Sequence, residues 1–410
     1  MATIERIWAR EILDSRDTPT IEAEILLSDD SVGVASIPSG ASTGKFEALE
    51  LRDGDTTRYN GKGVLKAVEN INDKIAKIIV GLKLEQKDFD RLIIEEDGTE
   101  NKSRLGANAV LASSLAFAKA NAVSHHQKLW QYFAEISETK KPALPTQMFN
   151  ILNGGRHAID STDIQEFMVV PTGESFAEKM RRGTEIYQAL KKILEEKNLP
   201  ITLGDEGGFV PTLSSNETAL KLVLAAIETV PSADGTKIAL DAAASEFFAD
   251  GKYSLRRDGK KFAGPELISL YEQWLTKYPI MSLEDPLAED DLENWKIITE
   301  KLGEKIMLVG DDLFATNPKR LKIGIEQKLA NAIIIKPNQI GTITETIETA
   351  KMAERAGFKI IVSHRSGETL DTSIAHLAVG LGAPFIKAGA PARPERLAKY
   401  EELLKIEEEL

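Results

Sequence analysis

Short apolar runs recur through the second half of the chain, and each of them ends on or reaches an ionisable residue. The six runs (KIALD, PIMSLED, IMLVGDD, NAIIIK, KIIVSH and PFIK) lead to Asp241, Glu284, Asp311, Lys336, His364 and Lys387. Successive end points are 23 to 43 residues apart, which is enough for one strand, one helix and their loops. Buried parallel strands read as continuous Val, Ile and Leu runs of this kind. The pattern therefore predicts a repeated strand–helix unit.

Two further candidate strands, TQMFNIL and DIQEFMVV, precede these runs, and segments with helical spacing separate the later ones. The candidate helices span residues 217–229, 265–277, 291–302, 318–329, 342–356 and 369–380, with Asn216 and Asn317 as candidate caps. Alternation of this length predicts an α/β fold with a parallel sheet. We expect a TIM-like (β/α)8 barrel. An open doubly wound sheet is the alternative, which the lack of a G-x-G-x-x-G motif after the first strand disfavours.

The first third of the chain has a different pattern. Three amphipathic strands are predicted within residues 3–37, and helices at 63–80 and 106–123. The segment ISETKKPALP at 136–145 carries two prolines and no periodicity. We therefore expect a smaller α+β N-terminal domain over residues 1–135 and the barrel over residues 140–410.

The amino-acid composition excludes several classes of chemistry and of binding partner. The 410 residues are too many for one ordinary core and include no cysteine, which excludes disulfides and thiolate chemistry. A formal charge of −13 argues against a nucleic-acid or anionic-membrane partner. The N-terminal residues form no apolar signal core, and no apolar stretch has the length of a membrane span. We expect a cytoplasmic protein without a membrane span.

Three of the strand ends are acidic, and the carboxyl ends of barrel strands carry catalytic groups. Asp241, Glu284 and Asp311 are hard oxygen ligands unaccompanied by cysteine, a set that suits Mg²⁺ better than zinc or copper. Each carboxylate could instead cap the following helix. Because the pattern repeats in three successive units, we favour the metal site.

Two later strands end on lysine. Lys336 lies between an apolar run and a proline, and neighbouring positive charge would lower its pKa and make it a general base. Lys387 would stay protonated and hold an anionic oxygen. Either side chain could instead be a solvated lysine at the barrel rim.

The run SHRSGET at 363–369 places His364, Arg365 and Ser366 at a strand-to-helix junction, where an anion such as phosphate could bind. Arg365 could instead pair with a structural carboxylate.

Two acids earlier in the chain are candidate proton donors. Glu206 precedes two glycines in LGDEGGF, and Glu166 follows Gln165 within an apolar strand. A carboxyl group near another acid has a raised pKa, so a Glu166–Glu206 pair could act as an acid. The two could also be unrelated. His157 lies in the glycine turn NGGRHA, where a single histidine is usually solvated. SGASTGK at 39–45 does not fit the P-loop spacing, and we expect a mobile loop at 39–44.

The ordered set of motifs resembles the enolase family over essentially the whole length of the chain. The matching segments are DSRDTPT, PSGASTGKFEALELRDGD, GKGV, NGGRHA, QEFMVVPTG, GDEGGF, LEDPLAEDD, GDDLFATNP, IKPNQIGT, SHRSGET and APARPERLAKY. The resemblance implies an enolase-type barrel and reversible dehydration of 2-phospho-D-glycerate to phosphoenolpyruvate in glycolysis, with two Mg²⁺ ions per site.

The resemblance also implies residue roles. Asp241, Glu284 and Asp311 would hold one Mg²⁺, and Ser42 would help to bind a second that arrives with substrate. Lys336 would remove the C2 proton, and Glu206, assisted by Glu166, would protonate the leaving hydroxyl. Substrate contacts are expected from His157, Gln165, Glu166, Glu284, Asp311, His364, Arg365, Ser366 and Lys387.

The chain departs from the family pattern at Asp17, which replaces a turn glycine of DSRGNPT. Aspartate tolerates left-handed geometry better than most residues, so we expect modest strain. The resemblance implies a homodimer or a dimer-based octamer. The alternatives are another Mg²⁺-dependent lyase or racemase of the superfamily, and a secondary surface-binding role with a cell-surface or secreted pool. The C-terminal EEEL lacks the lysine that such a role commonly uses.

Overall fold

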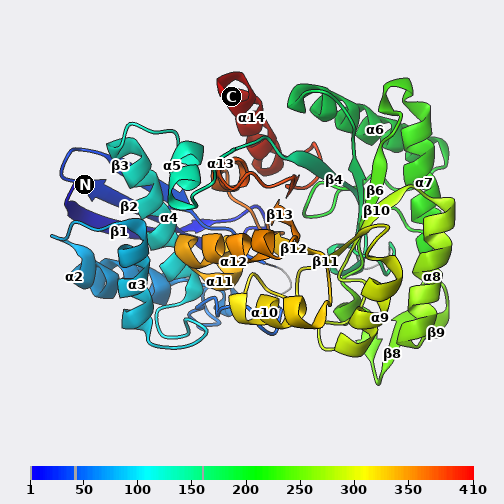
Figure 1. Ribbon diagram of the computed structural model, residues 1–410. Helices are drawn as coiled ribbons and strands as arrows, with labels where there is room; N and C mark the ends of the chain where they lie inside the picture. The colour runs from blue at the N-terminus through cyan, green and yellow to red at the C-terminus, as the bar shows by residue number, and fades with distance from the viewer. Residues whose placement is uncertain (1, 41–43, 159–160) are drawn as a thin grey trace.

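The computed structural model describes residues 2–40, 44–158 and 161–410. A three-stranded antiparallel sheet with its helices lies beside a closed eight-stranded barrel (Figure 1). The expected fold class, an α/β protein with a TIM-like barrel and a smaller α+β N-terminal part, is therefore confirmed. Residues 41–43 of the expected mobile loop, including Ser42, lie outside the described residues.

The N-terminal sheet has the order β1 (Ile4–Leu13), β2 (Pro19–Leu27) and β3 (Val32–Ser36). It is followed by η1 (Tyr59–Gly61), α1 (Leu65–Glu69), η2 (Asn70–Ile75), α2 (Ala76–Ile79), α3 (Gln86–Asp97), α4 (Ala107–Ser124) and α5 (Leu129–Ile136). The predicted helix at 63–80 contains the π-helical turn η2, and the sequence pattern did not predict α3 or α5. Asp17 adopts a φ of +56°, the left-handed geometry expected for the substituted turn glycine.

Helix α4 covers the inner face of this sheet and is buried on nearly all sides, as its alanine-rich sequence permits. The close approach depends on Gly33 of β3. A Cβ atom at that position would lie 2.1 Å from the carbonyl oxygen of Ala116 and 2.3 Å from the backbone nitrogen of Ala120. Because both atoms belong to the helix backbone, they cannot move aside as a side chain could.

The barrel is closed in the order β10-β11-β12-β13-β14-β4-β5-β6. The strands are β4 (Thr146–Asn153), β5 (Glu166–Val170), β6 (Lys237–Asp241), β10 (Ile280–Glu284), β11 (Met307–Gly310), β12 (Ala332–Ile335), β13 (Lys359–Ser363) and β14 (Phe385–Lys387). The expectation of a fully parallel sheet is wrong for one strand, because β5 runs antiparallel to both β4 and β6. Glu166 is the first residue of β5, and the antiparallel pairing places it opposite Asp241, the last residue of β6.

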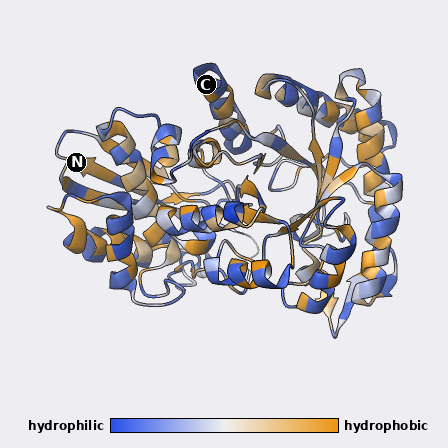
Figure 2. Ribbon diagram, in the orientation of Figure 1, coloured by the Kyte–Doolittle hydropathy of each residue, from blue (hydrophilic) through white to orange (hydrophobic). Residues whose placement is uncertain are grey.

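Helices cover the outside of the barrel, and the barrel strands are mostly hydrophobic (Figure 2). These helices are α6 (Phe176–Glu196), α7 (Asn216–Thr229), α8 (Gly264–Lys277), α9 (Leu292–Leu302), α10 (Pro318–Gln327), α11 (Pro337–Ile340), α12 (Ile343–Arg355), α13 (Ser373–Gly380) and α14 (Pro394–Glu409). The remaining elements are η3 (Gly155–His157), η4 (Pro231–Ala233), η5 (Ala244–Phe247) and a small sheet of β7 (Phe248–Ala249), β8 (Lys252–Leu255) and β9 (Lys260–Phe262). Asn317 caps α10 as predicted. Ser215, and not Asn216, caps α7, because its hydroxyl accepts the backbone N–H of Thr218.

A buried apolar layer fills the barrel below its mouth. Its members are Met148, Met168, Val170, Ala239, Val309, Ala332, Ile334 and Ile361. Side chains at alternate positions of a strand share a face. The polar residues at the strand ends above this layer therefore point into the mouth.

The N-terminal part docks beside this mouth. Ser39 pairs with Gly367 through a backbone bridge, and Lys102 Nζ lies 2.6 Å from Glu345 Oε1 of α12. Within the described ranges, no helix is both long and apolar enough to cross a membrane.

Candidate active site

The mouth of the barrel contains a polar pocket in which ten of the predicted site residues meet. These are Gln165, Glu166, Glu206, Asp241, Asp311, Lys336, His364, Arg365, Ser366 and Lys387. Glu284 is buried beside this set and contacts Lys387. His157 ends the turn η3, and its side chain, like Ser42, lies outside what the structure describes.

Lys387 is surrounded by carboxylates. Its Nζ lies 2.8 Å from Glu284, 3.0 Å from Glu166 and 3.1 Å from Asp241. Burial lowers the pKa of Lys387, but the three carboxylates together raise it well above its usual range. Lys387 is therefore a permanent cation, as the sequence predicted.

Lys336 follows β12 and forms a buried ion pair with Asp311. The sequence predicted that neighbouring positive charge would lower its pKa. Burial, Arg365 and Lys387 do lower the pKa of Lys336, but Asp311 outweighs them, so that the pKa is raised. The sequence pattern did not show that an acid would contact the lysine directly.

Further acids that the sequence analysis did not single out lie beside Asp311. One carboxylate oxygen from each of Asp285, Asp311 and Asp312 lies within 4.8 Å of the others. Asp285 accepts the backbone N–H groups of Asp311 at 3.0 Å and Asp312 at 2.8 Å. Burial, followed by Asp311, raises the pKa of Asp312 to about 8. The two adjacent acidic residues in SLED and in VGDD were the sequence feature from which Asp285 and Asp312 could have been predicted.

The strand ends are also strained. Asp285 directly follows β10 with a φ of +38°, and Ala243 lies two residues after β6 with a φ of +44°. Non-glycine residues at positive φ cost roughly 1–3 kcal/mol and cluster at functional sites. The strain therefore supports a functional role for this rim.

Glu206 lies on another side of the pocket, where Asn150 donates to one of its oxygens and His364 lies near the same oxygen. Asn150 Nδ2 donates to Glu206 Oε2 at 2.9 Å, and His364 Nε2 lies 3.4 Å from the same oxygen. Arg396 donates to His364 Nδ1 at 2.6 Å, so the neutral ring carries its proton on Nε2, which makes no hydrogen bond within the described residues. Burial lowers the pKa of His364 to about 4, which keeps the ring neutral. Asn150 and Arg396 were both missed from sequence.

Glu166 and Glu206 influence each other as predicted. Burial, followed by the charge of Glu206, raises the pKa of Glu166 well above its usual range. A raised pKa favours the protonated form of this carboxyl group, which is the property of a general acid.

The anion-binding candidates lie where the N-terminal part meets the barrel. Arg365 contacts Glu47 at 3.0 and 3.2 Å and donates to Asn338 Oδ1 at 3.0 Å. Here the alternative reading of Arg365, a pair with a carboxylate, is realised with Glu47, a residue missed from sequence. The run 363–369 does not begin a helix, because α13 starts at Ser373.

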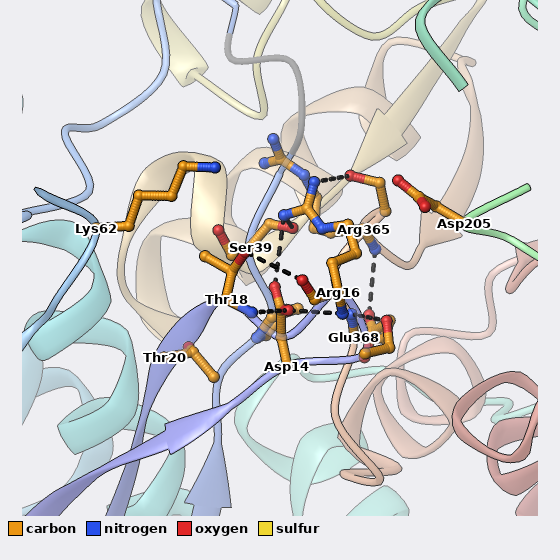
Figure 3. A network of polar contacts seen from close by, with 12 residues as sticks. Asp14, Arg16, Thr18, Thr20, Ser39, Lys62, Asp205, Arg365 and Glu368 are labelled. Atoms are coloured by element: carbon orange, nitrogen blue, oxygen red, sulfur yellow. Dashed lines mark hydrogen bonds and ion pairs between the residues drawn. The ribbon is translucent and has the colours of Figure 1, made fainter. Parts of the chain in front are cut away.

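Arg16 joins the β1–β2 turn to the same run. Figure 3 shows this guanidinium beside Asp14 and Ser39, and it donates to Ser366 Oγ at 3.2 Å and to the carbonyl of Ser39 at 3.1 Å. The anion-binding candidates are thus assembled from both parts of the chain.

The charge of the pocket fits a divalent cation. Among the described residues, eight acids line it against three basic residues, Lys336, Arg365 and Lys387. Several of these acids are buried, and burying unpaired carboxylates is costly. Carboxylate oxygens are the ligands that Mg²⁺ prefers. Asp285, Asp311 and Asp312, with Asp241 and Glu284 nearby, are therefore chemically suited to hold such an ion.

Comparison with known protein families agrees with this site. Residues 4–133 match the family model for the enolase N-terminal domain, and residues 141–410 match the model for the enolase C-terminal TIM barrel domain. Together the two matches cover almost the entire chain. The protein therefore belongs to the enolase family, a family of Mg²⁺-dependent lyases.

Proposed function

We propose that the protein catalyses the reversible dehydration of 2-phospho-D-glycerate to phosphoenolpyruvate. One observation carries this proposal: a lysine and a glutamic acid face each other across the barrel mouth. Lys336 follows β12 and Glu166 begins β5, and these strands are four places apart in a closed ring of eight. Removing a proton from one face of a substrate and a hydroxyl from the other needs a base and an acid in this relation.

In this proposal Lys336 removes the proton at C2. Its contact with Asp311 fixes the side chain at the mouth, and Asp311 is one of the proposed metal ligands. Mg²⁺, when bound, would stabilise negative charge on the substrate carboxylate and lower the cost of removing this weakly acidic proton. Lys387 would hold a carboxylate oxygen as a fixed cation.

The acid side consists of Glu206 with Glu166. The departing hydroxyl is a poor leaving group, so it must receive a proton as the C3–O bond breaks. Glu206 would supply that proton, and the nearby acid Glu166 would help to keep it protonated beforehand. Gln165 and His157 would contact substrate on this side.

Arg365 and Ser366 would bind the phosphate, with His364 close by. A guanidinium can bind a phosphate through two parallel hydrogen bonds. Arg365 already makes this type of contact with Glu47, in which its planar end donates to a pair of anionic oxygens.

The test is formation of phosphoenolpyruvate from 2-phosphoglycerate by the purified protein, followed by ultraviolet absorbance with Mg²⁺ and again after chelation. We expect turnover that chelation abolishes and added Mg²⁺ restores. Folded, Mg²⁺-loaded protein without turnover would overturn the proposal and favour another lyase or racemase of the superfamily. Turnover that survives chelation would overturn the metal assignment.

A further inference from the structure

Asn150 is a buried polar residue at the barrel mouth that the mechanism above does not use. It lies on β4 and is 0% exposed. Met148, two residues earlier, belongs to the apolar layer inside the barrel, so Asn150 points inward above that layer. Gln147 is an equally buried amide on the other face of the strand, where it donates to the carbonyl of Phe176 at 3.2 Å.

Glu206 is carried by a loop between α6 and α7, so its position must be fixed by contacts. The loop is bound to β4 by two backbone hydrogen bonds between Phe209 and the strand: Phe209 N–H to the carbonyl of Ile151 at 2.9 Å, and Asn153 N–H to the carbonyl of Phe209 at 2.8 Å. The same strand carries Asn150, whose Nδ2 lies 2.9 Å from Glu206 Oε2. The strand β4 therefore holds both the loop, through the backbone of Phe209, and the Glu206 carboxyl group, through Asn150.

The amide of Asn150 is kept despite an energetic cost. Among the described residues, its Oδ1 is buried and accepts no hydrogen bond. A buried acceptor left in this state costs roughly 1–3 kcal/mol, which an apolar side chain of similar size would avoid. Polar groups that reduce stability in this way are expected at functional sites.

We propose that Asn150 is the positioning residue that orients the Glu206 carboxyl group for proton donation to the leaving hydroxyl. The inference rests on the proposed function. Asn150 Nδ2 donates to Oε2, so in this proposal the acidic proton of Glu206 is carried on Oε1. During dehydration the Oε1–H bond and the substrate C3–O bond break, and the proton and the hydroxyl leave together as water. Glu206 is left as a carboxylate.

Asn150 therefore acts on one step and not on the other. A hydrogen bond to a carboxylate is stronger than one to a neutral acid, so the Asn150 N–H favours proton release from Glu206. Lys336 lies across the barrel and removes the C2 proton without Asn150. Loss of the amide should slow dehydration and leave C2 proton exchange in place.

The experiment compares N150L with Q147L in the full-length, Mg²⁺-loaded protein. Both residues lie on β4, and each has a buried amide whose oxygen accepts no hydrogen bond from the described residues. The two substitutions should therefore have similar effects on stability. With 2-phosphoglycerate in D₂O, NMR measures deuterium incorporation at C2 and absorbance measures phosphoenolpyruvate. For N150L we expect turnover to fall about 10- to 100-fold, as for a lost hydrogen bond to a charged group, with exchange within about threefold of wild type. Q147L should change neither rate.

The outcomes separate the two proposals. N150L turnover within about threefold of wild type would overturn the role of Asn150. An equal loss of exchange and turnover would also overturn it, because that result indicates a general structural effect. N150D keeps the size of the side chain but lacks the N–H donor. If N150L does not fold, N150D must show the same loss of turnover with C2 exchange retained. Wild-type protein without exchange or turnover would overturn the proposed function itself.

Discussion

A buried carboxylate at the junction of the two parts of the chain gives a sharp test of the structural reasoning. Asp90 of α3 is 0% exposed and accepts the backbone N–H of Thr344 at 2.9 Å and its hydroxyl at 2.6 Å, at the start of α12. Gln86 Nε2 donates to it at 3.2 Å. Asp90 therefore caps a barrel helix from the N-terminal part, which holds the two parts together beside the active site.

Burial, only partly offset by the hydroxyl groups of Ser114 and Thr344, raises the pKa of Asp90 to about 6 from its ordinary value of 3.8. The folded protein thus binds this proton more tightly than the unfolded chain does. The resulting stabilisation is complete below pH 3.8 and is lost as the pH rises through about 6. Linkage between these two pKa values gives a loss of about 1.5 kcal/mol between pH 5 and pH 7.5.

The assay is urea unfolding of wild-type protein and D90N at pH 5 and pH 7.5, because D90N cannot titrate at this position. The stability of wild type relative to D90N should fall by about 1.5 kcal/mol from the lower to the higher pH. Asp88 is half-exposed on the same helix, and D88N is the matched control, which should follow wild type at both pH values. A difference between wild type and D90N that does not change with pH, or grows in the opposite direction, would refute the argument.

Further substitutions test the catalytic roles and the packing. K336A should lower turnover and C2 exchange together, by about 10²- to 10⁴-fold, because it removes the base. E206Q should abolish dehydration but retain exchange, and loss of both would contradict its role as the acid. G33V should lower the free energy of unfolding by at least about 1–3 kcal/mol, because its side chain would meet the backbone of α4. A melting temperature equal to wild type would show that α4 can move aside.

Much of the fold was predictable because local periodicity encodes it. Continuous apolar runs bounded by charges gave the strands β6 and β10 to β14, and helical spacing gave most of the helices between them. The sequence analysis did not identify helices α3, α5, α6 and α14, although Ser175 caps α6. The left-handed geometry of Asp17 could also be foreseen, since it depends on the local turn alone.

The sequence by itself determined which residue types end the barrel strands. Because those strand ends meet at one rim, its acids and lysines lie there together. It could not determine which of them touch. The reversed direction of β5, the ion pair of Lys336 with Asp311 and the contact of Arg365 with Glu47 arise only when the barrel closes and the N-terminal part docks. The hydrogen bond from Asn150 to Glu206 also forms only in the folded barrel. Local pattern sets which elements form, whereas contacts between residues far apart in sequence depend on the closure of the whole fold, and those contacts set the charge states and orientations on which the chemistry depends.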